Sequence, residues 1–450
     1  MTTPSAAEQP APNVPAPELA RPGWVRGRVI ALLCLLGLIL YLDRVVMGQA
    51  LKPIQDEFKL SNEQTGLVAI AFTIAYGLFE IPTGHWGDRI GPRRVLTRIV
   101  LWWSTFTVLT AGAWNFGSLL FVRFAFGAGE AGAYPNAARV IKRWFPPTER
   151  ARVQGLLAGF SQVGAVLSPL LAQVIIREFG WRWAFVVFGL VGAVWVAIFW
   201  SWFRDDPADH PAVGPQELAT IRAGAEPASL AKPDTHEFPW DKLGHRNPWL
   251  LGFIISAASF VAYLYNTWYS KYLQSARDFD GDSASYAFAL LQGTSAAGIF
   301  VGGWIGDQIN RHPHTAVMWR RRLGFTGLGT AAAIQFFAHW PATPWLCISL
   351  AATSLFIMYL HHASWWSTVI DTGGKHHTGS LFGFCNGLGV VGGVAAQYFF
   401  GWFADWRGRQ GFTGRDQYDA AFMVCAVVLF CGACAWLAVR EIPPEKDAGH

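Results

Sequence analysis

RFAFGAGEAGAYPN, residues Arg123–Asn136, places two charges among residues that otherwise suit lipid or tight helix packing. In a helix, Arg123 and Glu130 are separated by nearly two full turns and project from the same face. A charge near the middle of a bilayer costs roughly 2.5–3.5 kcal/mol, so such residues usually face a partner or an aqueous cavity. Both residues are therefore functional candidates.

The same stretch contains the spacing G-x-G-x-x-G at Gly127, Gly129 and Gly132. That pattern indicates dinucleotide binding only where a strand precedes it within a βαβ unit. Here the glycines interrupt a long apolar segment, where small residues let neighbouring helices approach closely. We therefore interpret them as helix-packing positions.

The composition is typical of a membrane protein. Of 450 residues, 52% are hydrophobic and 14% are charged, which is too apolar for ordinary soluble domains. Twelve apolar segments of about 20 residues or more can each cross the hydrocarbon of a bilayer. They lie near residues 29–51, 64–84, 95–114, 117–142, 150–176, 183–203, 248–273, 284–306, 317–338, 343–370, 378–403 and 417–439. We expect an all-α polytopic membrane protein.

The positive charges predict the orientation. Most lysines and arginines fall in segments that are cytoplasmic if both termini are cytoplasmic, as the positive-inside rule requires. The net charge of +5 then reflects topology, and no basic motif indicates nucleic-acid binding. The expected parts are a flexible tail over 1–22, a six-helix bundle over 23–203, a cytoplasmic linker over 204–247 with a short helix at 215–223, a second bundle over 248–440 and a tail over 441–450.

Repeated motifs relate the two halves. The spacing Gly-x-x-Gly-Asp occurs at Gly84–Asp88 and again at Gly303–Asp307. Gly155, Gly159, Phe160 and Gln173 are likewise matched by Gly379, Gly383, Phe384 and Gln397. The chain therefore contains two related units.

The segment from Gly84 to Arg94, GHWGDRIGPRR, resembles the cytoplasmic loop between helices 2 and 3 of the major facilitator superfamily. That loop is a conformational latch in the family, so the resemblance implies gate roles for Asp88, Arg89, Arg93 and, through the second copy, Asp307. It also implies twelve transmembrane helices in two pseudo-symmetric six-helix bundles. Positive-inside topology alone would explain the arginines but not Asp88 and the glycines.

Within that superfamily, Arg123–Asn136 and the following residues 139–152 resemble the anion:cation symporter branch, which carries hexuronates, galactonate and other organic anions. The resemblance implies proton-coupled symport of a small organic anion, most fittingly a sugar acid, by a monomer in a bacterial-type inner membrane. The proton gradient would supply the energy, and we expect no cofactor and no metal site. An organic-anion exchanger or an efflux carrier is the alternative. A membrane enzyme or sensor is disfavoured, because no nucleophile elbow, phosphate loop or catalytic triad can be found.

Arg44 is the residue expected to bind the substrate carboxylate, because a guanidinium pairs bidentately with a planar anion. Neutral groups that could bind hydroxyls lie on several expected helices. They are Tyr41, Tyr76, Gln162, Tyr263, Asn266, Trp365, Ser367 and Asn386. The amides could instead only join helices by hydrogen bonds.

Asp43 and Glu130 are the expected proton-coupling acids. Burial favours the neutral acid and a nearby arginine favours the charged form, so protonation can respond to the side of the membrane that the group faces. Arg123 is the expected partner of Asp43 or Glu130. About 10 Å separates Arg123 from Glu130 along one helix, so direct pairing within that helix is disfavoured and we expect pairing across helices 1 and 4. The alternative is a static ion-pair network.

Two features depart from the branch. The seventh expected helix has Ser270-Lys271 where members commonly have a proline, and the tenth has the pair His361-His362. Because adjacent residues of a helix do not face the same way, we expect only one of the histidines to face a cavity. The choice among hexuronate, hexonate, aldarate and aromatic acid substrates stays open.

Overall fold

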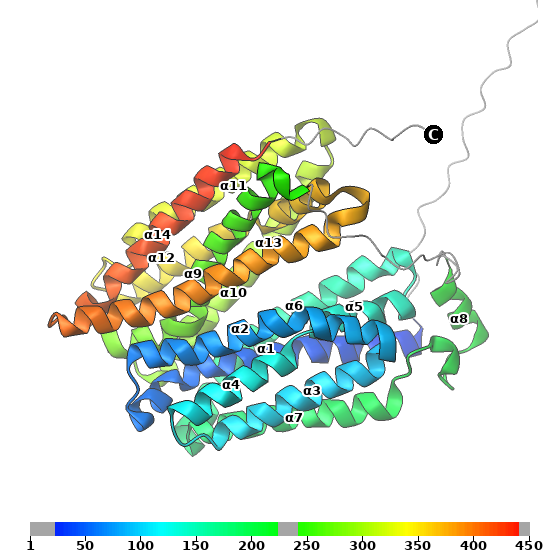
Figure 1. The fold of residues 1–450 in the computed structure, drawn as a ribbon, viewed down its shortest axis with the longest axis horizontal. Helices are drawn as coiled ribbons and strands as arrows, with labels where there is room; N and C mark the ends of the chain where they lie inside the picture. Colours follow the sequence, from blue (N-terminus) through cyan, green and yellow to red (C-terminus); the bar gives the residue numbers. More distant parts are fainter. Residues whose placement is uncertain (1–22, 224–241, 441–450) are drawn as a thin grey trace, which may run out of the picture.

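The computed structural model describes residues 23–223 and 242–440, and the regular secondary structure of these residues is entirely helical. Figure 1 shows two helical bundles side by side. The first consists of α1 (Trp24–Phe58), α2 (Asn62–Ile90), α3 (Pro92–Ala111), α4 (Phe116–Glu130), α5 (Ala133–Trp144), α6 (Pro147–Phe179) and α7 (Trp181–Trp202). The second consists of α9 (Arg246–Ala276), α10 (Gly281–Asn310), α11 (Pro313–Ala338), α12 (Pro344–Tyr359), α13 (His362–Arg409) and α14 (Arg415–Ala438). The tails expected at 1–22 and 441–450 lie outside the described residues.

Each bundle supplies six spans, as expected for a twelve-helix polytopic membrane protein. α4 and α5 together make one span, and α12 continues into the first part of α13. Eight spans in the described residues are long and apolar enough to cross a membrane by length and composition alone, including Pro344–Thr372 and Leu381–Arg409. α3 and α11 are not among these eight, and each carries three arginines in its first turns.

The linker contains η1 (Pro207–Asp209), α8 (Pro215–Arg222) and η2 (Lys242–Gly244). α8 forms where a short surface helix is expected. A hydrogen bond holds α8 against the start of α1, because the backbone nitrogen of Arg26 donates to the Glu217 carboxylate on α8 at 3.1 Å. The guanidinium of Arg26 also pairs with Glu149 at 2.7 Å, so the linker is tied to the end of the first bundle that carries the start of α1. We call this end of the molecule the linker end, and the opposite end the closed end.

The segment expected as one helix over 117–142 is broken. α4 ends at Glu130, Ala131 is extended with φ −56° and ψ 139°, and Gly132 has a φ of +84° before α5 begins. A side chain is disfavoured at this φ, and a Cβ on Gly132 would also collide with Thr83 on α2. The other two glycines of the motif pack as interpreted, because a Cβ on Gly127 or Gly129 would collide with Phe72 or Trp102.

Gly132→Ala is expected to destabilise the protein by at least about 1–2 kcal/mol, which is the usual cost of a left-handed conformation for a residue with a side chain. The collision with Thr83 adds to that cost. Thermal unfolding of the purified protein measures the effect, with Gly155→Ala as the control, because a Cβ on Gly155 meets nothing within 4 Å. Equal melting temperatures for the two variants would contradict the expectation.

The latch motif is also placed differently from the expected loop. α2 continues through Gly84–Asp88 as far as Ile90, and Gly91, with a φ of +85°, turns the chain directly into α3. Gly303–Asp307 likewise lies inside α10. The side chains of Asp88 and Arg89 lie outside the described residues.

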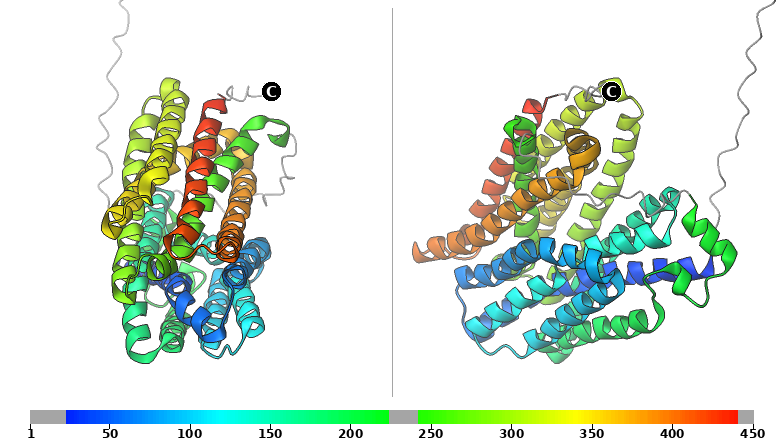
Figure 2. Two further views of the ribbon diagram at one scale, coloured as in Figure 1. Left: turned by 90° about the vertical axis from the view of Figure 1, so that its left-hand side faces the viewer. Right: turned by 45° about the vertical axis from the view of Figure 1, so that its right-hand side comes forward.

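The helices of the two bundles separate toward the linker end (Figures 1 and 2). At the closed end, side chains join the two bundles. Asp405 on α13 accepts hydrogen bonds from the first backbone amides of α2, at 3.2 Å from Asn62 and 2.8 Å from Glu63. Its carboxylate also accepts from the Asn62 side-chain amide at 2.6 Å, and buried Lys271 donates to the same amide group. Gln49 accepts from Ser270 at 3.0 Å and from Ser285 at 2.9 Å. A buried polar interface therefore seals this end.

Candidate functional site

A cavity of about 250 Å³ lies between the two bundles. α1, α2 and α4 form its wall in the first bundle, and α9, α10, α12, the turn before α13 and α13 itself form the opposite wall. Four of the expected substrate-binding residues line it, namely Tyr41, Arg44, Tyr263 and Asn266. Arg123 lines it as well. Both cavity-lining arginines thus come from the first half of the chain.

Arg44 forms an ion pair with Glu130 across α1 and α4. Its Nε donates to Glu130 Oε1 at 2.8 Å, and its terminal nitrogen contacts the same oxygen. The guanidinium also lies over the Tyr76 ring at 4.8 Å and the Tyr41 ring at 5.3 Å. Glu130 is 1% exposed and its second oxygen has no hydrogen-bond partner in the described part of the chain, so the ion pair with Arg44 is the main contact that offsets its buried charge.

Arg123 makes no ion pair among the described residues, although it is only 3% exposed. Its guanidinium lies over the rings of Phe126, at 4.4 Å, and Phe72, at 5.3 Å. The cross-helix pairing expected for Arg123 is therefore made by Arg44 instead. The structure leaves a buried guanidinium at the cavity wall that is held by aromatic faces, which contribute less than an anionic partner would.

Asp43 is buried next to this pair, with 1% of its surface exposed. Neither of its carboxylate oxygens has a hydrogen-bond partner in the described part of the chain. The charges of Glu130 and Arg123 both act on it. The four ionisable residues singled out in the sequence thus lie together beside one central cavity.

Both His361 and His362 line the cavity, so the expectation that only one of them could do so is wrong. The reason is that the chain is not a regular helix there, since α12 ends at Tyr359 and α13 begins at His362. The Nδ1 atom of His361 contacts the Met358 carbonyl, while its buried Nε2 has no partner in the described residues. His362 accepts a hydrogen bond from Trp366 at 3.2 Å.

Further polar residues of the cavity wall were not singled out from the sequence. They are Ser259, Thr267, Gln292, Tyr359 and Gln397. Gln397 links the bundles, because it accepts from Thr73 at 3.1 Å and donates to Thr267 at 3.3 Å. Its repeat relation to Gln173 was visible in the sequence, but such a relation does not say which residue faces a cavity.

The other expected substrate residues lie outside the cavity lining. Tyr76 does not line the cavity, but its ring contacts the guanidinium of Arg44, which does. Trp365 is buried and donates to the Leu251 carbonyl at 2.9 Å, and Ser367 donates to the Ala363 carbonyl at 3.0 Å. Gln162 on α6 and Asn386 on α13 are half-buried.

Of the expected gate residues, Arg93 and Asp307 have described side chains. The backbone nitrogen of Arg93 donates to Asp205 at 2.7 Å, and its guanidinium lies 4.4 Å above the Trp200 ring. Arg93 therefore connects the start of α3 to the end of α7 within the first bundle. Asp307 is exposed on α10.

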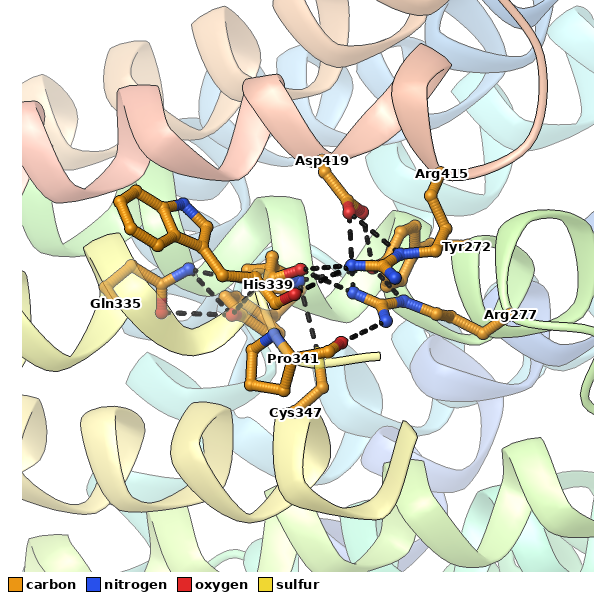
Figure 3. Close-up of polar contacts among 10 residues, drawn as sticks. Tyr272, Arg277, Gln335, His339, Pro341, Cys347, Arg415 and Asp419 are labelled. Carbon is orange, nitrogen blue, oxygen red and sulfur yellow. Dashed lines mark hydrogen bonds and ion pairs between the residues drawn. The ribbon is translucent and has the colours of Figure 1, made fainter. Parts of the chain in front are cut away.

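A second polar cluster lies where α9 and α11 end and α14 begins, and none of its residues named here lines the cavity. Figure 3 shows its side chains. Arg277 donates to the carbonyls of His339, at 2.6 Å, and Pro341, at 2.7 Å, and pairs with Asp419 at 3.4 Å. Burial, with Arg277 and Arg415 nearby, lowers the pKa of His339 well below its ordinary value. The cluster therefore holds a neutral histidine and fixes the connection between α11 and α12.

The fold and the cavity define a multi-pass membrane carrier. The sequence model of the major facilitator superfamily matches residues 33–397, and the chain belongs to that family. A bacterial homologue of the human lysosomal transporter Spinster, solved in an inward-facing and unoccupied conformation, has the same fold, with a TM-score of 0.76 at 20% identity over 94% of this chain and all of that one.

Several curated relatives are anion transporters. The chain is 33% identical to a probable sulfoacetate transporter, SauU, of Cupriavidus necator, over 94% of this chain and 97% of the relative. It is 28% identical to the hexuronate transporter of Bacillus subtilis, over 84% and 88% of the two chains. It is 27% identical to a probable L-galactonate transporter of Escherichia coli, over 94% and 92%. The protein is a transporter of the major facilitator superfamily, and these relatives carry organic anions.

Proposed function

We propose that this transporter imports a small organic anion together with protons, by alternating access, and that the anion is a sugar acid such as a hexuronate or hexonate. The observation that supports the proposal most is the Arg44–Glu130 ion pair at the cavity wall. Protonation of Glu130 removes the charge that competes with a substrate carboxylate for Arg44. Proton binding and anion binding then favour each other, which is the thermodynamic requirement for symport.

Asp43 is the second proposed proton carrier. Its buried carboxyl group has no hydrogen-bond partner among the described residues, and an unpartnered buried charge is costly in a membrane interior. A change in access from one side of the membrane to the other would therefore alter its protonation. The proton gradient is the proposed driving force, with no cofactor.

The neutral cavity wall supports a polyhydroxylated substrate. Tyrosine, serine, threonine and amide side chains supply donors and acceptors around the two arginines. The cavity volume of about 250 Å³ is below the roughly 300–1,000 Å³ of sites for drug-sized ligands, so it suits a small metabolite. The hexuronate and galactonate transporters among the relatives also support this class.

We further propose that the protein is a monomer in a bacterial inner membrane, with both termini and the linker in the cytoplasm. The distribution of lysine and arginine supports this orientation. The linker end would then be the cytoplasmic end, and the described conformation would be closed to the outside.

Reconstituted proteoliposomes test the proposal. A gradient of one pH unit, acidic outside, is expected to drive about tenfold accumulation of a sugar acid per coupled proton, because one unit corresponds to about 1.4 kcal/mol. Accumulation is measured with labelled hexuronate and hexonate, and empty liposomes are the control. Flux that requires a second anion inside, and that ignores the pH gradient, would identify an exchanger instead.

A second candidate substrate is an anion with two charged ends, such as sulfoacetate. Arg123 favours it, because this cavity-lining guanidinium has no ion pair among the described residues while Arg44 lies close by. The probable sulfoacetate transporter among the relatives supports the same class.

Arg123→Gln distinguishes the two substrates. The loss of one charge-assisted hydrogen bond, worth about 1.5–3 kcal/mol, is expected to weaken binding of a two-headed anion by at least about tenfold. Binding of a sugar acid with one carboxylate is expected to change less, since Arg44 remains. Ligand-induced thermal shifts measure both affinities. Equal losses for the two anions would contradict the assignment of a separate role to Arg123.

A further inference from the structure

Two grooves flank the outer surface of α3 near the linker end. One, of about 170 Å³, lies between α2, α3 and α4 and includes Phe79, Ile99 and Trp102 in its lining. The other, of about 410 Å³, lies between α3 and α7 and includes Val196, Ala197 and Trp200. Arg98 lines both grooves, so one positively charged side chain lies on the ridge between two largely apolar grooves.

The exposed face of α3 is positively charged near the linker end and apolar toward the closed end. Arg94 and Arg98 are both exposed and lie one turn apart in the first two turns of the helix. Toward the closed end, the same surface presents Leu101 and Trp102, which are 49% and 51% exposed. Cations near a helix end followed by a hydrocarbon-facing surface match the order of headgroup and acyl chains in one leaflet of a bilayer.

We propose that this surface binds one anionic phospholipid, with its phosphate on Arg94 and Arg98 and one acyl chain in each groove. Charge complementarity selects the headgroup, because arginine pairs with phosphate oxygens in a forked geometry. Because Arg98 lies on the ridge between the grooves, a lipid whose phosphate is bound there can place one acyl chain in each groove. One wall of the α2–α4 groove is held in place, since the Trp102 indole donates to the Ala125 carbonyl at 2.8 Å.

The site is separate from the transport cavity. None of the residues that line the two grooves lines that cavity. The α2–α4 groove does, however, contact Ala128 and Gly129, which directly precede Glu130. A bound lipid would therefore support the helix that carries one wall of the site.

Native mass spectrometry of the full-length protein in detergent tests the proposal, with phosphatidylglycerol or phosphatidylcholine added. One phosphatidylglycerol is expected to bind in preference to phosphatidylcholine. Arg94→Gln/Arg98→Gln is expected to lower its affinity by about thirtyfold, because each arginine near anionic lipid contributes roughly fivefold. Ala197→Phe, which narrows the α3–α7 groove without changing charge, is expected to weaken it several-fold.

Arg322→Gln is the matched control, because Arg322 is an exposed arginine on α11, in the corresponding part of the second bundle. It is expected to leave binding unchanged. Equal binding of the two lipids, or an equal loss in Arg322→Gln, would overturn the proposal. Competition by glycerophosphoglycerol at the same concentration as the lipid would also overturn it, since the acyl chains would then contribute nothing.

Discussion

Glu130→Gln is expected to abolish pH-driven accumulation of substrate while exchange of substrate across the membrane continues. Glutamine keeps the shape of the side chain but cannot carry a proton, and it leaves Arg44 without its anionic competitor. With a gradient of one pH unit, accumulation is expected to fall from about tenfold to none if one proton is coupled. Labelled-substrate uptake and counterflow in proteoliposomes measure the two activities.

Glu57→Gln is the matched control for that experiment. Glu57 also pairs with an arginine, Arg182, but both residues are more than 40% exposed and lie at the closed end. Accumulation by this variant is expected to equal that of the unmodified protein. If Glu130→Gln accumulated substrate as well as Glu57→Gln, Glu130 would not be a coupling residue.

Arg44→Gln is expected to lower the free energy of unfolding by about 3–5 kcal/mol, because it leaves the Glu130 carboxylate buried without its cation. The double variant Arg44→Gln/Glu130→Gln is expected to recover most of that loss, since no unpaired charge remains. The loss in the single variant is also expected to shrink as the pH is lowered, because protonation of Glu130 removes the same charge. Thermal unfolding in detergent at several pH values measures these differences.

Arg182→Gln provides the comparison for Arg44→Gln. An exposed ion pair contributes about 0–1 kcal/mol, so this variant is expected to be nearly as stable as the unmodified protein. Equal destabilisation by Arg44→Gln and Arg182→Gln would contradict the role assigned to the buried pair. A double variant as unstable as Arg44→Gln alone would contradict it as well.

The sequence carried enough information to predict that helices 1 and 4 bring Asp43, Arg44, Arg123 and Glu130 together. Charged residues in apolar membrane helices usually face the interior of the helix bundle or an aqueous cavity. Their positions therefore indicate that these four residues lie in the same part of the bundle interior. It did not carry the rotation of each helix about its axis, which decides that the ion pair across helices 1 and 4 joins Arg44 to Glu130 and not Arg123 to Asp43. That rotation depends on packing such as the close approach of Gly127 to Phe72.

The breaks in two spans were missed for a related reason. Apolar periodicity continues through Gly132 and through the Leu360–His361 turn, so neither interruption changes the pattern from which helices were predicted. The glycines of the latch motif predict a turn and hence a loop, whereas only Gly91 has a positive φ between Asn62 and Ala111. Backbone conformation at a glycine depends on its neighbours in space, such as Thr83 beside Gly132.

The carboxylate of Asp405 completes the first turn of α2 from the other half of the molecule. When the bundles separate at that end, the exposed amides of the helix have to be solvated by water instead. The hydrogen bonds of this contact are only part-buried, because the Asp405 carboxylate also lines an open groove beside Ser61 and Glu63. In the proposed alternating-access cycle, the return of the empty carrier therefore depends on hydration of a helix terminus.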